Sequence, residues 1–154
     1  MKYAENTSVS VEKSKAEIEI LLQRYGADQF LNAWEEGRAM IQFRANGKYV
    51  KFILPLPNKT DEKFLRHPRF YRTYSSEKSL QLWEQACRQA WRALALVVKA
   101  KLEAVESGIT SFEEEFFAHI VLPNGKTVFQ ETHKNVELAY SSGKVGNLLG
   151  FDGL

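Results

Sequence analysis

The sequence has few of the features that mark secreted, disulfide-bonded or membrane proteins. It contains one cysteine, Cys87, so no internal disulfide can form. The first seventeen residues lack the apolar centre and small-residue cleavage site of a secretory signal. The best apolar run, Ala93–Val98, is far shorter than the roughly 18 to 20 residues that cross a membrane. We therefore expect a soluble protein in the reducing cytoplasm, with no membrane partner.

The familiar catalytic motifs are also absent. There is no glycine-rich phosphate loop, nucleophile elbow, Cys-x-x-Cys pair or dinucleotide fingerprint. Cys87 occupies an apolar helical position, where burial would raise the pKa of the thiol and suppress its reactivity. His67 and His133 have no evident nucleophile or carboxylate partner in the sequence. The sequence favours a non-enzymatic protein without a cofactor.

Residues 113–119 contain a cluster of acidic residues and one histidine. Glu115 and His119 are four residues apart, close to Glu113 and Glu114, so they could supply two ligands to a divalent metal, as in a metal-dependent nuclease. No second cluster has a matching spacing, and acidic residues in a first helical turn are already favoured by the helix dipole. We expect no metal site.

The 154 residues, 44% of them hydrophobic and 12% aromatic, are enough for one domain with a substantial core. Ser14 and Glu17 form a capping-box pattern, and apolar residues at helical spacing end at Gly26, which predicts a helix over about 12–25. Strand-like runs at 39–44 and 48–54 flank Asn46-Gly47, the typical signature of a β-hairpin. Its predicted pairs are Phe43 with Val50, Ile41 with Phe52 and Ala39 with Leu54, which makes one face wholly apolar.

The second half of the sequence is mainly helical in pattern. Apolar residues recur every three or four positions from Leu80 to Val105, which predicts a long central helix that packs on the hairpin. A short acidic helix follows Thr110 or Ser111. Residues 120–129 fit either a second hairpin or a tight turn between helices. We predict a single α+β domain over residues 1–145 and a flexible glycine-rich tail over 146–154.

Charge is distributed unevenly along the chain, although its net value is only +2. Residues 1–40 have a net charge of −2 and residues 102–154 a net charge of −5. Residues 41–101 contain thirteen basic and four acidic side chains, a net charge of +9. A basic block of this size suits a polyanionic partner if its cations meet on one surface.

The strongest candidate within this block is residues 63–74, where basic and aromatic side chains alternate. Cations neutralise phosphates and aromatic faces stack on unpaired bases, so the combination is typical of nucleic-acid binding. The alternative is that the aromatic residues anchor a long loop on the core and the cations keep it soluble. The candidate residues here are Lys63, Arg66, Arg69, Phe70, Tyr71, Arg72 and Tyr74.

Two further groups of cations could extend this surface. Arg88, Arg92 and Lys99 share one stripe of the long helix, although such a stripe is more often simply solvated. Arg44, Lys48 and Lys51 belong to the hairpin. If all three groups project to the same side, they form one continuous positive groove.

Three segments carry a resemblance to a known group of proteins: residues 7–27, residues 52–57 (FILPLP) and residues 91–128. They are similar to a family of short uncharacterised proteins encoded by bacteriophages and bacterial mobile elements. No activity or site residue comes with that resemblance. It implies a role in DNA metabolism or in the interplay with host defence.

The leading hypothesis is therefore a small phage-type accessory protein that binds nucleic acid, including single-stranded DNA in recombination or replication. The alternative is a protein-interaction or anti-defence factor whose acidic ends and tail contact a host protein or a second copy of the chain. Segregated charge suits both hypotheses, and a homo-oligomer fits the second.

Overall fold

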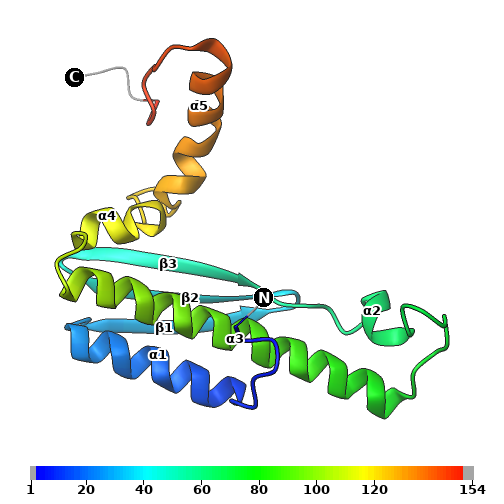
Figure 1. Ribbon diagram of the computed structural model, residues 1–154. Coiled ribbons are helices and arrows are strands. Elements are labelled where there is room, and N and C mark those ends of the chain that lie inside the picture. Colours follow the sequence, from blue (N-terminus) through cyan, green and yellow to red (C-terminus); the bar gives the residue numbers. More distant parts are fainter. Residues whose placement is uncertain (1–2, 151–154) are drawn as a thin grey trace.

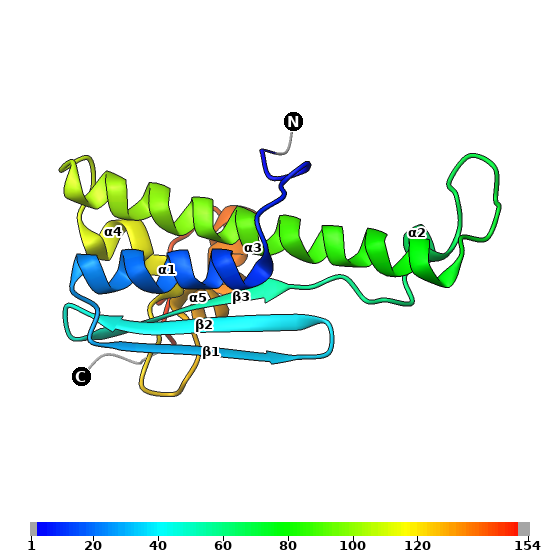
Figure 2. The same cartoon turned by 90° about the horizontal axis from the view of Figure 1, so that it is seen from below.

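The computed structural model, which describes residues 3–150, has the predicted α+β architecture. A three-stranded antiparallel sheet in the order β1-β2-β3 carries α1 and α3 on one face (Figures 1 and 2). The elements are α1 (Val11–Tyr25), β1 (Gln29–Glu35), β2 (Arg38–Ala45), β3 (Lys48–Pro55), α2 (Glu62–Leu65), α3 (Ser76–Glu106), α4 (Phe112–Phe116), the 3-10 helix η1 (Phe117–His119) and α5 (Val128–Ser142).

The hairpin of β2 and β3 has the register that its sequence predicts. Phe43 pairs with Val50, Ile41 with Phe52 and Ala39 with Leu54. The turn residues Asn46 and Gly47 both have positive φ, 52° and 72°, which is the conformation that a two-residue hairpin turn requires. The apolar face of the hairpin is buried against α1 and α3 and forms one side of the core.

Strand β1 was not expected from the sequence. It pairs with β2 in antiparallel register from Gln29 with Arg44 to Glu35 with Arg38. As an edge strand it leaves most of its side chains exposed, so its residues do not alternate cleanly between apolar and polar.

Both long helices form as predicted, with one correction at a cap. Helix α1 starts at Val11 because the Ser10 side chain accepts a hydrogen bond from the Lys13 amide, and it ends at Gly26, whose φ is 105°. The predicted capping box at Ser14 and Glu17 is wrong, since Ser14 lies inside the helix and is fully buried. Helix α3 is 31 residues long and buries Trp91, Val98 and Leu102.

The C-terminal third is more helical than the sequence suggests. The acidic helix α4 has a full capping box at Ser111 and Glu114. Of the two readings of residues 120–129 the tight turn is correct, because Val121 and Thr127 form a single bridge and α5 starts at Val128. The start of the predicted tail lies along α5, where Asn135 donates to the carbonyl of Leu148 at 2.9 Å, and residues 151–154 lie outside the described part of the chain.

No helix within residues 3–150 combines the length and the apolar character needed to span a bilayer.

Candidate nucleic-acid interface

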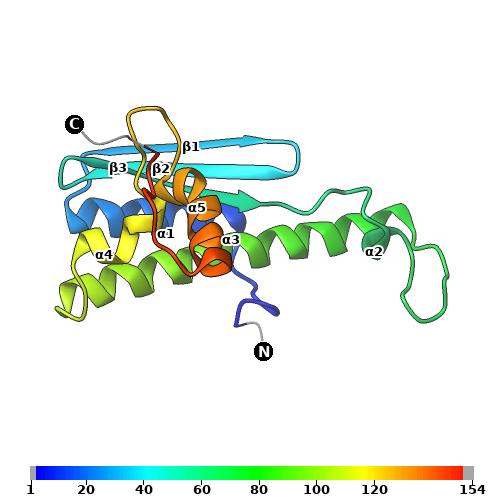
Figure 3. The same ribbon diagram turned by 90° about the horizontal axis from the view of Figure 1, so that it is seen from above.

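The segment between β3 and α3, residues 56–75, extends beyond the end of the sheet and is called the arm below (Figures 2 and 3). The first part of α3 extends with it. The arm is fixed at its base, where the Trp83 indole donates to the carbonyl of Pro57 at 2.8 Å and Lys59 lies 4.3 Å from the centre of the same indole. Phe64 of α2 is buried. The sequence of this segment shows no helical or strand periodicity, yet the arm contains one helical turn and a small hairpin-like tip.

The tip of the arm, residues 66–73, is ordered by local hydrogen bonds. Arg66 and Thr73 form a bridge, and the His67 amide donates to the carbonyl of Arg72 at 2.8 Å. The Nδ1 atom of His67 accepts from the amides of Arg69 and Phe70 at 3.2 and 3.3 Å. These bonds satisfy the backbone of the turn without help from the rest of the protein. His67 thus shapes the tip, a role that the sequence did not reveal.

The side chains of the tip point into solvent. Phe70 is 69% exposed and Tyr71 is 79% exposed, which is unusual for large aromatic residues in a structured turn. Tyr71 also has a positive φ of 51°, a conformation that costs free energy for a residue with a large side chain. The hydrogen bonds at His67 hold Tyr71 in this position. The predicted alternative, that the aromatic residues anchor the loop, is correct only for Phe64, while Tyr74 is half-buried.

The arm also keeps its positive charge. It has five basic and two acidic residues, and no acid occurs between Lys63 and Ser76. Arg66, Arg69 and Arg72 are exposed, and within residues 3–150 none of them forms an ion pair. Their nearest aromatic contact is that of Arg69, which lies 5.7 Å from the centre of the Phe70 ring. Cations and aromatic faces therefore share one exposed tip.

The hairpin cations lie elsewhere and are largely occupied. Arg44 binds Asp28 through two hydrogen bonds of 2.8 and 2.6 Å, and this guanidinium lowers the pKa of the Asp28 carboxyl. Lys48 pairs with Glu113 of α4 at 3.3 Å. Lys51 donates to the carbonyl of Gly125 at 2.9 Å.

The stripe on α3 does share one side of the helix but faces other parts of the fold. Arg92 pairs with Glu17 of α1, and Arg88 donates to Gln85 one turn earlier. Lys99 is exposed. Lys101, which the sequence places off this stripe, pairs with Glu115 at 3.0 Å.

The predicted continuous groove is therefore wrong. Four of the thirteen cations, Arg44, Lys48, Arg92 and Lys101, pair with carboxylates of the acidic N- and C-terminal segments. The β2–β3 turn with Lys48 lies beside α4, at the end of the molecule opposite the arm (Figure 2). Within residues 3–150, the arm keeps three neighbouring cations, Arg66, Arg69 and Arg72, that form no ion pair.

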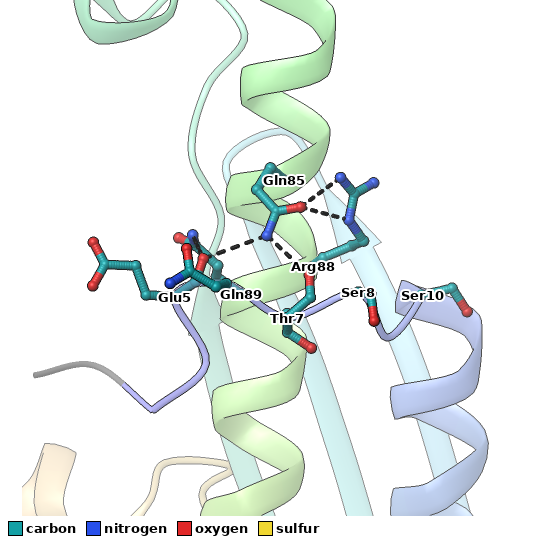
Figure 4. Close-up of a pocket in the computed structure, with 8 residues that line it drawn as sticks. Glu5, Thr7, Ser8, Ser10, Gln85, Arg88 and Gln89 are labelled. Carbon is teal, nitrogen blue, oxygen red and sulfur yellow. Dashed lines mark hydrogen bonds between the residues drawn. The ribbon is translucent and has the colours of Figure 1, made fainter.

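A shallow pocket lies midway along α3, where the N-terminal segment crosses the helix (Figure 4). Gln85 donates to the carbonyl of Thr7 at 2.9 Å, and Gln89 donates to that of Glu5. The Ser10 hydroxyl is already used to cap α1. Because most of these polar groups bind one another, the pocket fixes the N-terminal segment on α3 and offers a ligand little. No sequence signal indicated this contact.

The acidic cluster at α4 has structural partners. Glu115 accepts hydrogen bonds from Lys101 and Thr110, which lower the pKa of its carboxyl. His119 stacks on Phe52, with 4.1 Å between ring centres, and burial lowers the pKa of its imidazole. No group of three metal-ligating side chains occurs in the described part of the chain. Cys87 is buried as expected, and burial raises the pKa of its thiol.

Comparisons with family models, with curated proteins and with solved structures gave no match, so the similarity to phage-encoded proteins stays a prediction from the sequence.

Proposed function

We propose that the protein binds nucleic acid through the tip of the arm, without sequence specificity and without catalysis. The observation that supports this most directly is the grouping of Arg66, Arg69 and Arg72 with the exposed rings of Phe70 and Tyr71. The proposal is narrower than the one suggested by the thirteen cations of the sequence. It needs only the arm, and the hairpin and α3 serve as its support.

The tip contributes to nucleic-acid affinity in two ways, through its arginines and through its aromatic rings. Each arginine that reaches a phosphate releases counterions, so binding weakens as salt is added. An exposed ring stacks on an unpaired base and contributes about 1 to 3 kcal/mol per base, whatever the base. Because stacking needs unpaired bases, the tip fits single-stranded nucleic acid better than a closed duplex. The mobile-element setting and the cytoplasmic location inferred from the sequence agree with such a role.

Replacing Arg66, Arg69 and Arg72 by alanine should abolish most of the binding. A labelled single-stranded oligonucleotide is titrated at two salt concentrations by fluorescence anisotropy. The slope of log affinity against log salt should fall by about 2, because each lost phosphate contact removes about 0.7. Thermal unfolding should be unchanged, since all three side chains are exposed and outside the core.

The matched control removes the same charge from other places. Arg24 of α1, Lys99 of α3 and Lys134 of α5 are exposed, and each is replaced by alanine in a second triple variant. This control should bind like the wild type if the arm is the interface. Equal losses in both variants would mean that only net charge matters, and unchanged affinity in the arm variant would remove the arm from the proposal.

The rival hypothesis is electrostatic association through the acidic ends, and it has less support in the structure than in the sequence. Glu17, Glu113 and Glu115 of those ends pair with cations of the same chain and are not free to attract a partner. The exposed apolar surface of the C-terminal third gives a different basis for association, one that does not involve these charges.

A further inference from the structure

The face of the sheet that points away from α1 and α3 carries an uncovered apolar patch. This side of the sheet is called the outer sheet face below. Its apolar residues are Leu31, Ala33, Met40 and Ile53. Leu31 is 50% exposed and Ile53 is 44% exposed, although both belong to regular strands. A sheet with apolar residues on both faces normally packs a layer on each. In the part of the chain that the structure describes, this sheet has a helical layer on one face only (Figure 2).

Helix α5 has an uncovered apolar face of its own. Phe129, His133, Val136 and Tyr140 follow one another at intervals of four, three and four residues and form one stripe, the α5 stripe. Phe129 is 59% exposed and Tyr140 is 89% exposed. Val128 is the one buried residue of the helix. A 15-residue helix is marginal in water by itself, so α5 needs a surface to pack on.

The position of α5 indicates that this surface is not its own sheet. The turn before α5 is tied to β3, since Lys51 binds the carbonyl of Gly125 and Ile120 bridges to Val50. From this turn α5 leads away from the sheet and from α3 (Figure 1). Reaching the outer sheet face of the same chain would require these contacts to break.

We propose that the chain forms a symmetric dimer in which the α5 stripe of each copy packs on the outer sheet face of the other. Each chain has both uncovered surfaces, the helix stripe and the sheet face. In a dimer with twofold symmetry each stripe covers the sheet face of the partner, so no uncovered surface is left to bind a third copy. The charges agree as well. Lys51 lies on the outer sheet face without a carboxylate partner in residues 3–150, and the exposed Glu137 flanks the α5 stripe.

The size of the contact predicts a reversible dimer. A helix of 15 residues is about 22 Å long and about 10 Å wide, so each helix–sheet contact covers on the order of 200 Å² on each partner. Counted on both partners, two such contacts bury on the order of 800 Å² in total, which is below the roughly 1,200 Å² of stable specific interfaces and in the range of weak, transient ones. Dimer and monomer should therefore exchange with concentration.

Cross-linking between two different variants tests the exchange directly. Ile53→Cys and Val136→Cys chains are mixed and treated with a short thiol-reactive cross-linker. The mixture should give a covalent dimer, while wild type, whose Cys87 is buried, should give none. A mixture of Ile53→Cys with Ile109→Cys is the control, because Ile109 is exposed but outside both surfaces. Absence of the first cross-link overturns the proposal, as does a cross-link that forms within one chain when both cysteines are on it.

Sedimentation without nucleic acid gives a second readout. Wild type should approach twice the chain mass as its concentration rises, and Val136→Asp should stay monomeric with unchanged circular dichroism. Leu138→Asp changes an exposed residue on the other side of α5 and should still dimerise. A wild type that is monomeric at every concentration contradicts the proposal. The arm variant should dimerise normally, so failure here and failure of nucleic-acid binding are distinguishable.

Discussion

At the scale of single residues, the conformation of the tip depends on His67. Its Nδ1 atom accepts two backbone hydrogen bonds that the turn cannot make otherwise. His67→Ala should therefore loosen the tip and weaken oligonucleotide binding several-fold, because the rings and arginines lose their fixed arrangement. Affinity is measured by anisotropy, as for the arginine variants.

His67→Asn tests whether binding depends on the two hydrogen bonds that this side chain accepts. In His67→Asn the side-chain oxygen can accept from the same two amides, so binding should be largely retained. Neither variant should change the melting temperature, since the tip is outside the core. Equal binding by the alanine and asparagine variants would show that these hydrogen bonds do not organise the interface.

The stability of the protein should depend on pH through His119. Burial, followed by the charge of Lys101, lowers the pKa of this imidazole in the folded state. In the unfolded chain its pKa is about 6.5, so as the pH falls through that value the unfolded state takes up a proton that the folded state excludes. The free energy of unfolding should therefore fall as the pH drops below about 6.5. Urea denaturation at a series of pH values above and below 6.5 measures it.

His119→Phe is the variant for this prediction. A phenyl ring can keep the stacking on Phe52 but has no proton to bind, so the slope of stability against pH should become shallower. The lowered pKa values of Asp28, Glu113 and Glu115 act at more acidic pH, where the loss of stability follows protonation of carboxylates. A slope equal to that of wild type would mean that the folded protein accepts the proton on His119 freely.

At the scale of elements, α4 is attached to the sheet mainly by Phe116. Its ring is completely buried and meets Phe43 and Phe52 edge-on, at 5.8 and 6.3 Å between ring centres. Phe116→Ala should lower the free energy of unfolding by about 3 to 5 kcal/mol because it opens a cavity there. Phe117→Ala, at an exposed neighbouring position, should cost about 0.5 kcal/mol. Similar losses in both variants would contradict this packing.

The sequence predicted the elements that are determined by a local pattern of their own residues. Asn46-Gly47 sets the hairpin register, and the three- and four-residue spacing of α3 gives its buried face. Strand β1 was missed because it buries few side chains and its residues do not alternate between apolar and polar. The start of α5 stayed open because the sequence of residues 120–129 fits a hairpin as well as a turn between helices. The cap of α1 was misplaced because Ser10 and Ser14 both fit the local rule, and only tertiary burial decides between them.

At the scale of the whole molecule, basic and acidic residues that are separate along the chain lie side by side in the fold. Pairs such as Arg44 with Asp28 and Arg92 with Glu17 join residues that are far apart in sequence. No local pattern reveals such pairs, and counting charges therefore overestimated the basic surface. The cations of the arm stay together because its acid-free run is contiguous in the sequence and in the fold.

The projection of the arm predicts where the folded protein is cleaved first. Brief trypsin treatment should cut after Arg69 or Arg72, since these residues are exposed and lie in a tip outside the core, while the sheet and its helices stay intact. A bound oligonucleotide should slow this cut specifically. Mass spectrometry of the fragments identifies the site. First cleavage within α3 or the sheet, or cleavage in the arm that the oligonucleotide does not affect, would contradict the arrangement described.

If the arm binds nucleic acid as proposed, its anchoring at Trp83 and Phe64 also separates the residues that contact the ligand from those that stabilise the fold. Most hydrogen bonds of residues 66–73 are made within the tip, so on the proposed function mutations there should affect binding far more than folding. Such a segment can diverge quickly under selection. The same scaffold could then present different peptides at one site, in the way that antibody domains present different loops.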